Sequence, residues 1–266
     1  MVSPEAVKLD ELLRNAPKAV DMDLQHQREA GEHAEDMTSE PEGVRFEDAP
    51  AVGGLWATLL GRRVVDHVPL WWRLRHLLAP ERPFPSAVED AAADYRWLLG
   101  EGHHPERVVI AGNSSAGGLT VAAMLKLRDD GAALPAGGVP ISPWVDLVCT
   151  GETLETNAAA DLTVTKASLL RMAGQYLDGA DPRNPLASSL YADLSGLLPL
   201  LVVVGGAEAL LDDSVRLARS AGMVGVDVTL YIRAGMQHIR PIYCGAIPEA
   251  DAAVAMTGAW IRSRKS

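Results

Sequence analysis

Residues 107–118 of this 266-residue chain read Arg-Val-Val-Ile-Ala-Gly-Asn-Ser-Ser-Ala-Gly-Gly, and a helical pattern follows from Leu119 to Arg128. The apolar run predicts a buried strand, and the small residues predict a tight turn into the helix. Such a turn either cradles phosphate or exposes a nucleophilic serine at a strand-to-helix elbow. A phosphate loop ends in lysine followed by serine or threonine, and no lysine comes directly after Gly118. The residues therefore favour the elbow.

Two serines in this turn compete for the position of the nucleophile. Ser114 has a glycine two positions before it but an alanine two positions after it. Ser115 has a glycine two positions after it but an asparagine two positions before it. Neither completes the Gly-x-Ser-x-Gly pattern, whose small residues let the strand and the helix approach each other. The turn alone leaves both serines open.

Strand and helix patterns alternate along the rest of the chain. This alternation predicts an α/β fold with a mostly parallel sheet covered by helices on both faces. Near the N-terminus, Ser3-Pro4 predicts the start of a helix, and Ser86 with Glu89 three residues later predicts a capping box. The expected elements are a hairpin of Val44–Phe46 and Leu55–Leu60, strands at Gly138–Ser142, Leu200–Val204 and Val226–Ile232, and helices at Ser86–Leu99, Lys166–Leu177, Asp213–Ala221 and Glu249–Arg262.

A serine nucleophile needs a base and an acid that orients the base. His238 is the candidate base, because it follows a strand and a flexible turn near the C-terminus. Glu208 is the candidate acid, since it comes just after the Leu200–Val204 strand, at the strand end where α/β sites gather. Asp212 and Asp213 are rivals, and all three carboxylates also suit the start of the following helix. The order serine, acid, histidine is that of α/β hydrolases.

Composition excludes several other classes of protein. The chain carries 24 Lys and Arg against 35 Asp and Glu, a net charge of -11, which disfavours binding to nucleic acid or to anionic membrane surfaces. Its two cysteines, Cys149 and Cys244, form neither a disulfide framework nor a cysteine zinc site. No signal-peptide layout and no membrane-spanning apolar run is present, so we expect a cytoplasmic protein. We expect no metal, because the histidines lack zinc-ligand spacing.

Six segments of the chain resemble bacterial esterases of the hormone-sensitive lipase family (family IV). The match extends from about Leu78 to Arg262 and is closest to the branch of short-chain carboxylesterases and monoterpene lactone hydrolases. The segments are Leu78-Ala-Pro-Glu-Arg-Pro-Phe-Pro85, Tyr95-Arg-Trp-Leu-Leu99, Pro105-Glu-Arg-Val-Val-Ile-Ala-Gly112, Ile141-Ser-Pro-Trp-Val-Asp-Leu147, Asp181-Pro-Arg-Asn-Pro-Leu-Ala187 and Gly235-Met-Gln-His238.

The resemblance assigns roles to the candidate residues. It implies Ser114 as the nucleophile, Glu208 as the acid and His238 as the base, with the backbone N–H of Ser115 in the oxyanion hole. Ser115 stays the alternative nucleophile and Asp212 the alternative acid. The implied reaction is the hydrolysis of short-chain esters or lactones without a cofactor, and a homodimer fits the family.

The resemblance also implies how the chain is divided. We expect residues 1–40 to form N-terminal cap helices over an acyl pocket. Residues 41–266 would then form the α/β-hydrolase domain, with residues 150–178 contributing to the cap.

One departure from the family lies upstream of the serine. Family members carry a His-Gly-Gly-Gly loop that supplies most of the oxyanion hole, and this sequence has no such motif. Gly53-Gly54 lacks the preceding histidine. The family needs a strand, this loop, a helix and another strand where only residues 61–77 are present, although those elements require roughly 30 residues. We expect that a central strand-helix unit is deleted. The rival to an active esterase is therefore an impaired remnant, or a scaffold that binds ligands without turnover.

Overall fold

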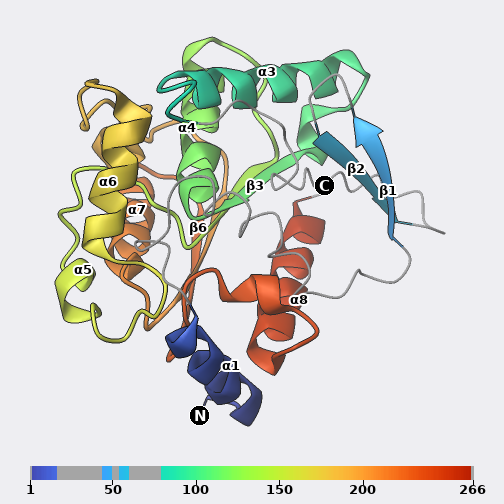
Figure 1. Ribbon diagram of the computed structural model, residues 1–266. Helices are drawn as coiled ribbons and strands as arrows, with labels where there is room; N and C mark the ends of the chain where they lie inside the picture. The colour runs from blue at the N-terminus through green and yellow to red at the C-terminus, as the bar shows by residue number, and fades with distance from the viewer. Residues whose placement is uncertain (1, 17–43, 50–53, 60–78, 265–266) are drawn as a thin grey trace.

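The computed structural model describes residues 2–16, 44–49, 54–59 and 79–264. Helices and strands alternate through this part of the chain (Figure 1). The helices are α1 (Pro4–Asn15), α3 (Ser86–Gly100), α4 (Ser115–Asp129), α5 (Thr153–Thr156), α6 (Lys166–Leu177), α7 (Leu211–Met223) and α8 (Pro248–Ser263). The strands are β1 (Val44–Ala49), β2 (Gly54–Leu59), β3 (Val109–Asn113), β4 (Gly137–Ile141), β5 (Leu200–Gly205) and β6 (Val228–Arg233).

Four strands form a parallel sheet in the order β3-β4-β5-β6. Strand β5 lies inside this sheet and is buried along its whole length, as its unbroken run of apolar residues predicts. The carboxyl ends of all four strands meet at one edge, where the loops that follow them come together. The prediction of an α/β fold with a mostly parallel sheet is confirmed.

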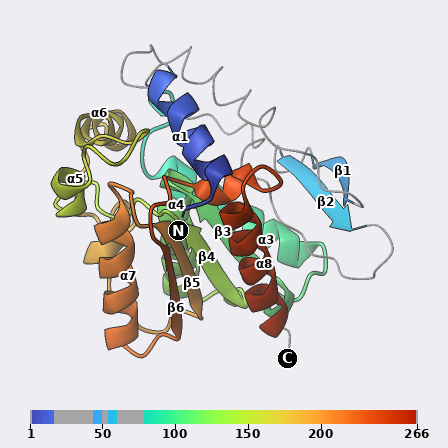
Figure 2. The ribbon, with the colours of Figure 1, turned by 90° about the horizontal axis from the view of Figure 1, so that it is seen from below.

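The two faces of the sheet are covered by different helices. Ile110 and Val202 belong to a core cluster with apolar residues of α3, α4 and α7. Leu201 and Val203, which alternate with them in direction, pack instead with Trp260 of α8. Figure 2 shows α7 and α8 on opposite sides of the strands. Each fully buried Leu or Val contributes about 1.5–3 kcal/mol, so the two layers fix the sheet from both sides.

The predicted hairpin is present as an antiparallel pair of β1 and β2, with Val44 opposite Leu59 and Ala49 opposite Gly54. Its turn, residues 50–53, lies outside the described residues. The same holds for residues 17–40 of the predicted N-terminal cap, and for residues 61–77, where the deletion is expected. Within the part of the chain that is described, β3 is hydrogen-bonded to β4 and to no other strand.

Helix α1 begins as predicted, with Ser3 as its N-cap and Pro4 in the first turn. Its buried Ala6 and Leu9 pack against Met236 and Ile247, so the start of the chain lies against the segment that follows β6. The helix expected from Ser86 also forms, but its N-cap is Pro85 and no side chain caps it. The predicted capping box is therefore wrong, because Ser86 already lies inside the helix, where its hydroxyl cannot reach the first free N–H groups.

Candidate active site

The predicted elbow lies between β3 and α4. Ser114 adopts φ 52° and ψ -119°, a backbone conformation that a residue with a side chain rarely takes. Its N–H donates to the carbonyl of Ile141, and its own carbonyl accepts from the N–H of Trp144. These bonds join the elbow to the loop that follows β4. They hold the Ser114 side chain at the carboxyl edge of the sheet.

Two glycines make the sharp turn sterically feasible. A Cβ on Gly112 would lie 2.2 Å from the carbonyl oxygen of Ala116, and one on Gly118 would lie 2.1 Å from that of Trp144. Real Cβ atoms do not approach backbone oxygens so closely. The small residues of this turn therefore allow close contact of strand, helix and neighbouring loop, which is the structural reason for the elbow pattern.

Three of the predicted site residues come together in a chain of hydrogen bonds. The Ser114 Oγ lies 2.9 Å from Nε2 of His238, and Nδ1 of the same ring lies 2.9 Å from Oε2 of Glu208. A carboxylate can only accept, so Nδ1 carries the ring proton and Nε2 is left to accept from the serine hydroxyl. His238 is 6% exposed and Glu208 is fully buried. This arrangement can draw the proton from Ser114.

The loops that carry Glu208 and His238 approach each other at Gly205. A Cβ there would lie 2.2 Å from the carbonyl oxygen of Met236, two residues before His238. The N–H of Gly205 also donates to Oε1 of Glu208 at 2.5 Å. The N–H of Ala207 donates to the carbonyl of Met236. The end of β5 thus holds the acid and the base within reach of each other.

The structure places the alternative residues differently. Ser115 is the first residue of α4 and its side chain is exposed, whereas the hydrogen bond to His238 comes from Ser114. Asp212, in the first turn of α7, accepts from the N–H of Glu152 at 3.0 Å. Asp213 accepts from the N–H groups of Val145 and Asp146. Of the three carboxylates considered, Glu208 is the one hydrogen-bonded to His238.

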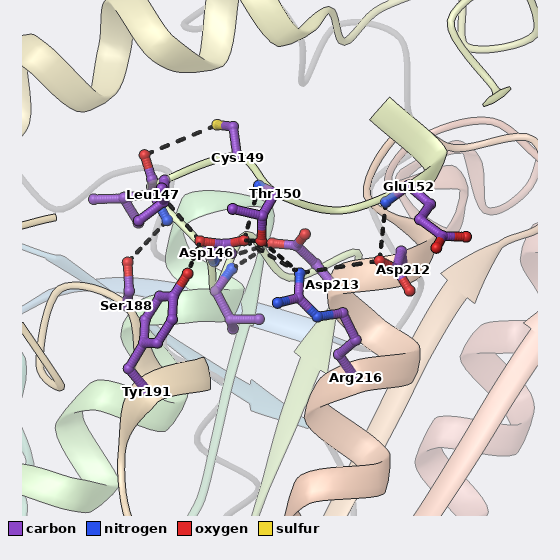
Figure 3. A network of polar contacts seen from close by, with 12 residues as sticks. Asp146, Leu147, Cys149, Thr150, Glu152, Ser188, Tyr191, Asp212, Asp213 and Arg216 are labelled. Atoms are coloured by element: carbon purple, nitrogen blue, oxygen red, sulfur yellow. Dashed lines mark hydrogen bonds and ion pairs between the residues drawn. The ribbon is translucent and has the colours of Figure 1, made fainter. Parts of the chain in front are cut away.

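Asp212 and Asp213 belong to a polar network beside the site, centred on Asp146 (Figure 3). The fully buried Asp146 carboxylate accepts from Thr150, Tyr191 and Arg216. Burial raises the pKa of Asp146, but the hydrogen bonds from Thr150 and Tyr191 and the charge of Arg216 outweigh it and lower the pKa overall. The network binds the loop after β4 to α7 and so supports the acid loop from the side.

A segment between α5 and α6 is tied to both candidate catalytic loops. The side-chain amide of Asn157 donates to the carbonyl of Glu208 at 2.9 Å. The side chain of Gln237, next to His238, bonds Ala160 and Leu162. These residues were not predicted from the sequence. In the sequence, the one indication of a role was that Gln237 directly precedes the candidate base His238.

Of the remaining histidines, His103 and His104 follow α3, and the others lie outside the described residues. No group of three or more His, Cys, Asp or Glu side chains that could hold a metal ion occurs in the described ranges.

Comparisons with known proteins show the family of the chain. The sequence profile of the alpha/beta hydrolase fold family matches residues 74–240, more than half of the chain. The chain belongs to the α/β-hydrolase family. This α/β hydrolase is 46% identical over 190 residues to an acetyl-hydrolase of Streptomyces hygroscopicus, covering 71% of the chain and 64% of that relative. It is 36% identical over 179 residues to an esterase of Acinetobacter venetianus, covering 67% of the chain and 59% of that relative.

The solved structures that resemble this α/β hydrolase include esterases of the bacterial hormone-sensitive lipase family. An esterase from the bacterial hormone-sensitive lipase family is 34% identical, with a TM-score of 0.89 and full coverage of both chains. A mutant of the esterase E40 is 35% identical, with a TM-score of 0.91 over 99% of this chain and 100% of the other. The predicted α/β-hydrolase fold class is confirmed. No helix among the residues described is long and apolar enough to span a membrane.

Proposed function

We propose that this chain hydrolyses carboxylic esters through a covalent acyl-enzyme on Ser114. The observation that carries the proposal is the continuous chain of hydrogen bonds from Ser114 through His238 to the buried Glu208. A serine hydroxyl is a weak nucleophile by itself, and a hydrogen-bonded imidazole makes it reactive by removing its proton. The resemblance to esterases and to an acetyl-hydrolase supports the same chemistry.

The steps of ester hydrolysis follow from the positions of Ser114, His238 and Glu208. Ser114 Oγ attacks the ester carbonyl carbon while its proton moves to Nε2 of His238. Glu208 stabilises the imidazolium through Nδ1, and the imidazolium then gives the proton to the departing alcohol. A water molecule attacks the acyl-enzyme by the same route, which releases the carboxylic acid and restores Ser114.

The oxyanion of the tetrahedral intermediate needs N–H donors. The N–H of Ser115 is the donor that we propose, because it lies at the first position of α4, where helix N–H groups have no partner within the helix. The positive end of the helix dipole adds to its effect. The sequence lacks the His-Gly-Gly-Gly loop of the family, and we propose that the strand-helix unit carrying it is deleted.

The missing loop supports a second candidate function, an impaired remnant or a ligand-binding scaffold of the same fold. Removing a single oxyanion donor costs about 2.7–4 kcal/mol, or 10²–10³ in rate, in a well-studied protease. Losing several donors slows the reaction further unless other N–H groups replace them. We therefore expect slow turnover rather than none, because the groups that activate Ser114 are in position.

We propose short-chain esters or lactones as substrates. The family resemblance implies both, and the acetyl-hydrolase relative favours a small acyl group. We also propose a cap formed by α1 with the segment that carries α5 and α6. Leu12 at 61% and Leu170 at 47% exposure give these helices apolar surface that is free of packing within the described chain, which supports a cap. The homodimer and the cytoplasmic location stay predictions.

Hydrolysis of p-nitrophenyl acetate and p-nitrophenyl butyrate tests the proposal. We expect measurable release of p-nitrophenol by the purified protein and by Ser115→Ala, and none above background by Ser114→Ala. Loss of activity in Ser115→Ala alone would make Ser115 the nucleophile. A folded wild-type protein without activity would favour the scaffold.

A further inference from the structure

Ser142 is a buried serine at the carboxyl end of β4, outside the three residues of the proposed triad. It is 1% exposed, and its backbone adopts φ 46°, in the region that favours glycine. Its N–H donates to the carbonyl of Val203 in the neighbouring strand β5. The backbone bond and the sheet thus fix Ser142 beside the end of β5, near the acid loop.

The hydroxyl of Ser142 connects the acid to the segment that carries the base. It donates its proton to Oε1 of Glu208 at 2.7 Å and accepts from the N–H of Ile239 at 3.1 Å. Ile239 directly follows His238 and has φ 49°. One hydroxyl group therefore bridges Glu208 and the backbone beside His238, two segments about 30 positions apart in the chain.

These contacts determine which way the Glu208 carboxylate faces. Oε1 is held by two donors, the Ser142 hydroxyl and the N–H of Gly205, while Oε2 accepts from Nδ1 of His238. A hydrogen bond to a charged group is stronger than one between neutral groups. Without the hydroxyl, Oε1 keeps one donor, the carboxylate can rotate, and the N–H of Ile239 loses the Ser142 oxygen as its acceptor.

Position 142 holds a serine although its backbone conformation suits a glycine better. Glycine would adopt φ 46° without strain, whereas a residue with a Cβ pays a cost in this region. Serine retains this backbone strain, but its hydroxyl supplies a hydrogen-bond donor and an acceptor at once. Both are used here, one toward the acid and one toward the base segment.

We propose that Ser142 is a positioning residue that holds Glu208 and His238 in the orientation needed to activate Ser114. The proposal rests on the proposed ester hydrolysis, and it concerns a residue that acts through Glu208 without touching substrate. It predicts that the Ser142 hydroxyl affects the chemical step and leaves substrate binding unchanged.

Kinetics of Ser142→Ala and Ser142→Gly test this prediction. We expect kcat on p-nitrophenyl acetate to fall about 10- to 100-fold in both variants, with KM within about twofold of the wild type. Ser142→Gly also removes the backbone strain, so it reports on the hydroxyl if Ser142→Ala folds poorly. Ser214→Ala is the matched control, since Ser214 is equally buried but its hydroxyl donates to the carbonyl of Leu210 in its own helix. We expect the control to keep its kcat.

Nitrogen NMR of histidine-labelled protein tests the same point without turnover. We expect the wild type to hold His238 with its proton on Nδ1, a signal assigned by its absence in His238→Ala. In Ser142→Ala we expect a mixture of both ring tautomers, and in Ser214→Ala the wild-type spectrum.

The two proposals fail in different ways. An unchanged tautomer and a kcat within twofold in the Ser142 variants would overturn the role of Ser142. An absent Nδ1–H signal in the wild type would overturn it as well. A wild type without hydrolysis, but with a tautomer that relaxes in Ser142→Ala, would refute the proposed function and leave the positioning role standing.

Discussion

The hydroxyl oxygen of Ser114 lies 2.9 Å from Nε2 of His238, although the two residues are 124 positions apart in the chain. Two short segments create this contact. The elbow after β3 holds the serine through its backbone bonds to Ile141 and Trp144, and the turn after β6 holds the histidine through Met236. The contact depends on the close approach of these segments at the carboxyl edge of the sheet.

Replacing each carboxylate in turn tests whether Glu208 or Asp212 is the acid of the triad. We expect Glu208→Gln to lower kcat about 10³- to 10⁴-fold, because the amide no longer stabilises the imidazolium and does not enforce the proton on Nδ1. We expect Asp212→Asn to stay within about threefold of the wild type, since Asp212 bonds the N–H of Glu152 instead of His238. Steady-state kinetics on p-nitrophenyl acetate measures both. The reverse ranking would make Asp212 the acid.

Two helical glycines give a matched test of the close packing at the elbow. A Cβ on Gly118 would meet the Trp144 carbonyl oxygen at 2.1 Å, whereas one on Gly174 in α6 would meet nothing within 4 Å. We expect Gly118→Ala to lower the free energy of unfolding by about 2 kcal/mol or more. Gly174→Ala should raise it by up to about 1 kcal/mol, as alanine is the better helix former. Urea unfolding at pH 7 compares them, and equal effects would contradict the packing.

Asp213 predicts a dependence of stability on pH. Burial raises the pKa of its carboxyl from 3.8 to about 7; the N–H groups of Val145 and Asp146 and the Arg216 charge oppose the rise, whereas the Asp146 charge adds to it. Between about pH 4 and pH 7 the folded chain keeps a proton that the unfolded chain has released. The contribution of Asp213 to stability therefore falls as pH rises through this range, and it levels off above pH 7.

Asp213→Asn isolates that contribution, because the amide oxygen can still accept from Val145 and Asp146 while the charge is removed. We expect the free energy of unfolding of the variant, relative to the wild type, to rise steadily between pH 4 and pH 7. Urea unfolding at intervals of one pH unit measures the difference. A difference that stays constant across this range would show that Asp213 titrates at its ordinary pKa.

The ion pair between Arg240 and Asp10 predicts a large effect from the N-terminal helix. Arg240 is 3% exposed and its Nη2 lies 2.7 Å from Oδ1 of Asp10, while its Nε and Nη1 have no hydrogen-bond partner among the described residues. We expect Asp10→Ala to cost about 3–5 kcal/mol of stability, since it leaves a buried charge without its carboxylate. The double variant with Arg240→Met should recover part of the loss. A cost below about 1 kcal/mol for Asp10→Ala would contradict the pairing.

The sequence predicted those elements whose local signals are strong. The unbroken apolar run Leu200–Val204 marked β5, and the boundaries of α6 were predicted correctly, where Thr165 and Ser168 form a capping box at the start. The capping box at the start of α3 was predicted wrongly, because Ser86 and Glu89 fit the pattern but Pro85 takes the cap position. Local patterns identify a helix more reliably than they identify the residue that caps it.

The candidate site was less predictable, because its contacts join residues far apart in the chain. Asp212 and Glu208 have the same local signal, a carboxylate near the start of a helix. The family resemblance favoured Glu208, and the tertiary fold shows which of the two bonds His238. Ser142 gave no signal of its own, since a serine after a strand is common. Its partner Glu208 lies 66 positions away, and a single sequence does not show that pairing.

Labelling with a fluorophosphonate, followed by mapping of the modified peptide, tests directly whether Ser114 is activated. This reagent requires an activated serine and no particular ester, so it separates activation of the nucleophile from substrate choice. We predict that the label is found on Ser114, persists in Ser115→Ala, and is lost in Ser114→Ala and in His238→Ala. Label on Ser115, or an unlabelled wild-type protein that is folded, would contradict the activation of Ser114 by His238 and Glu208.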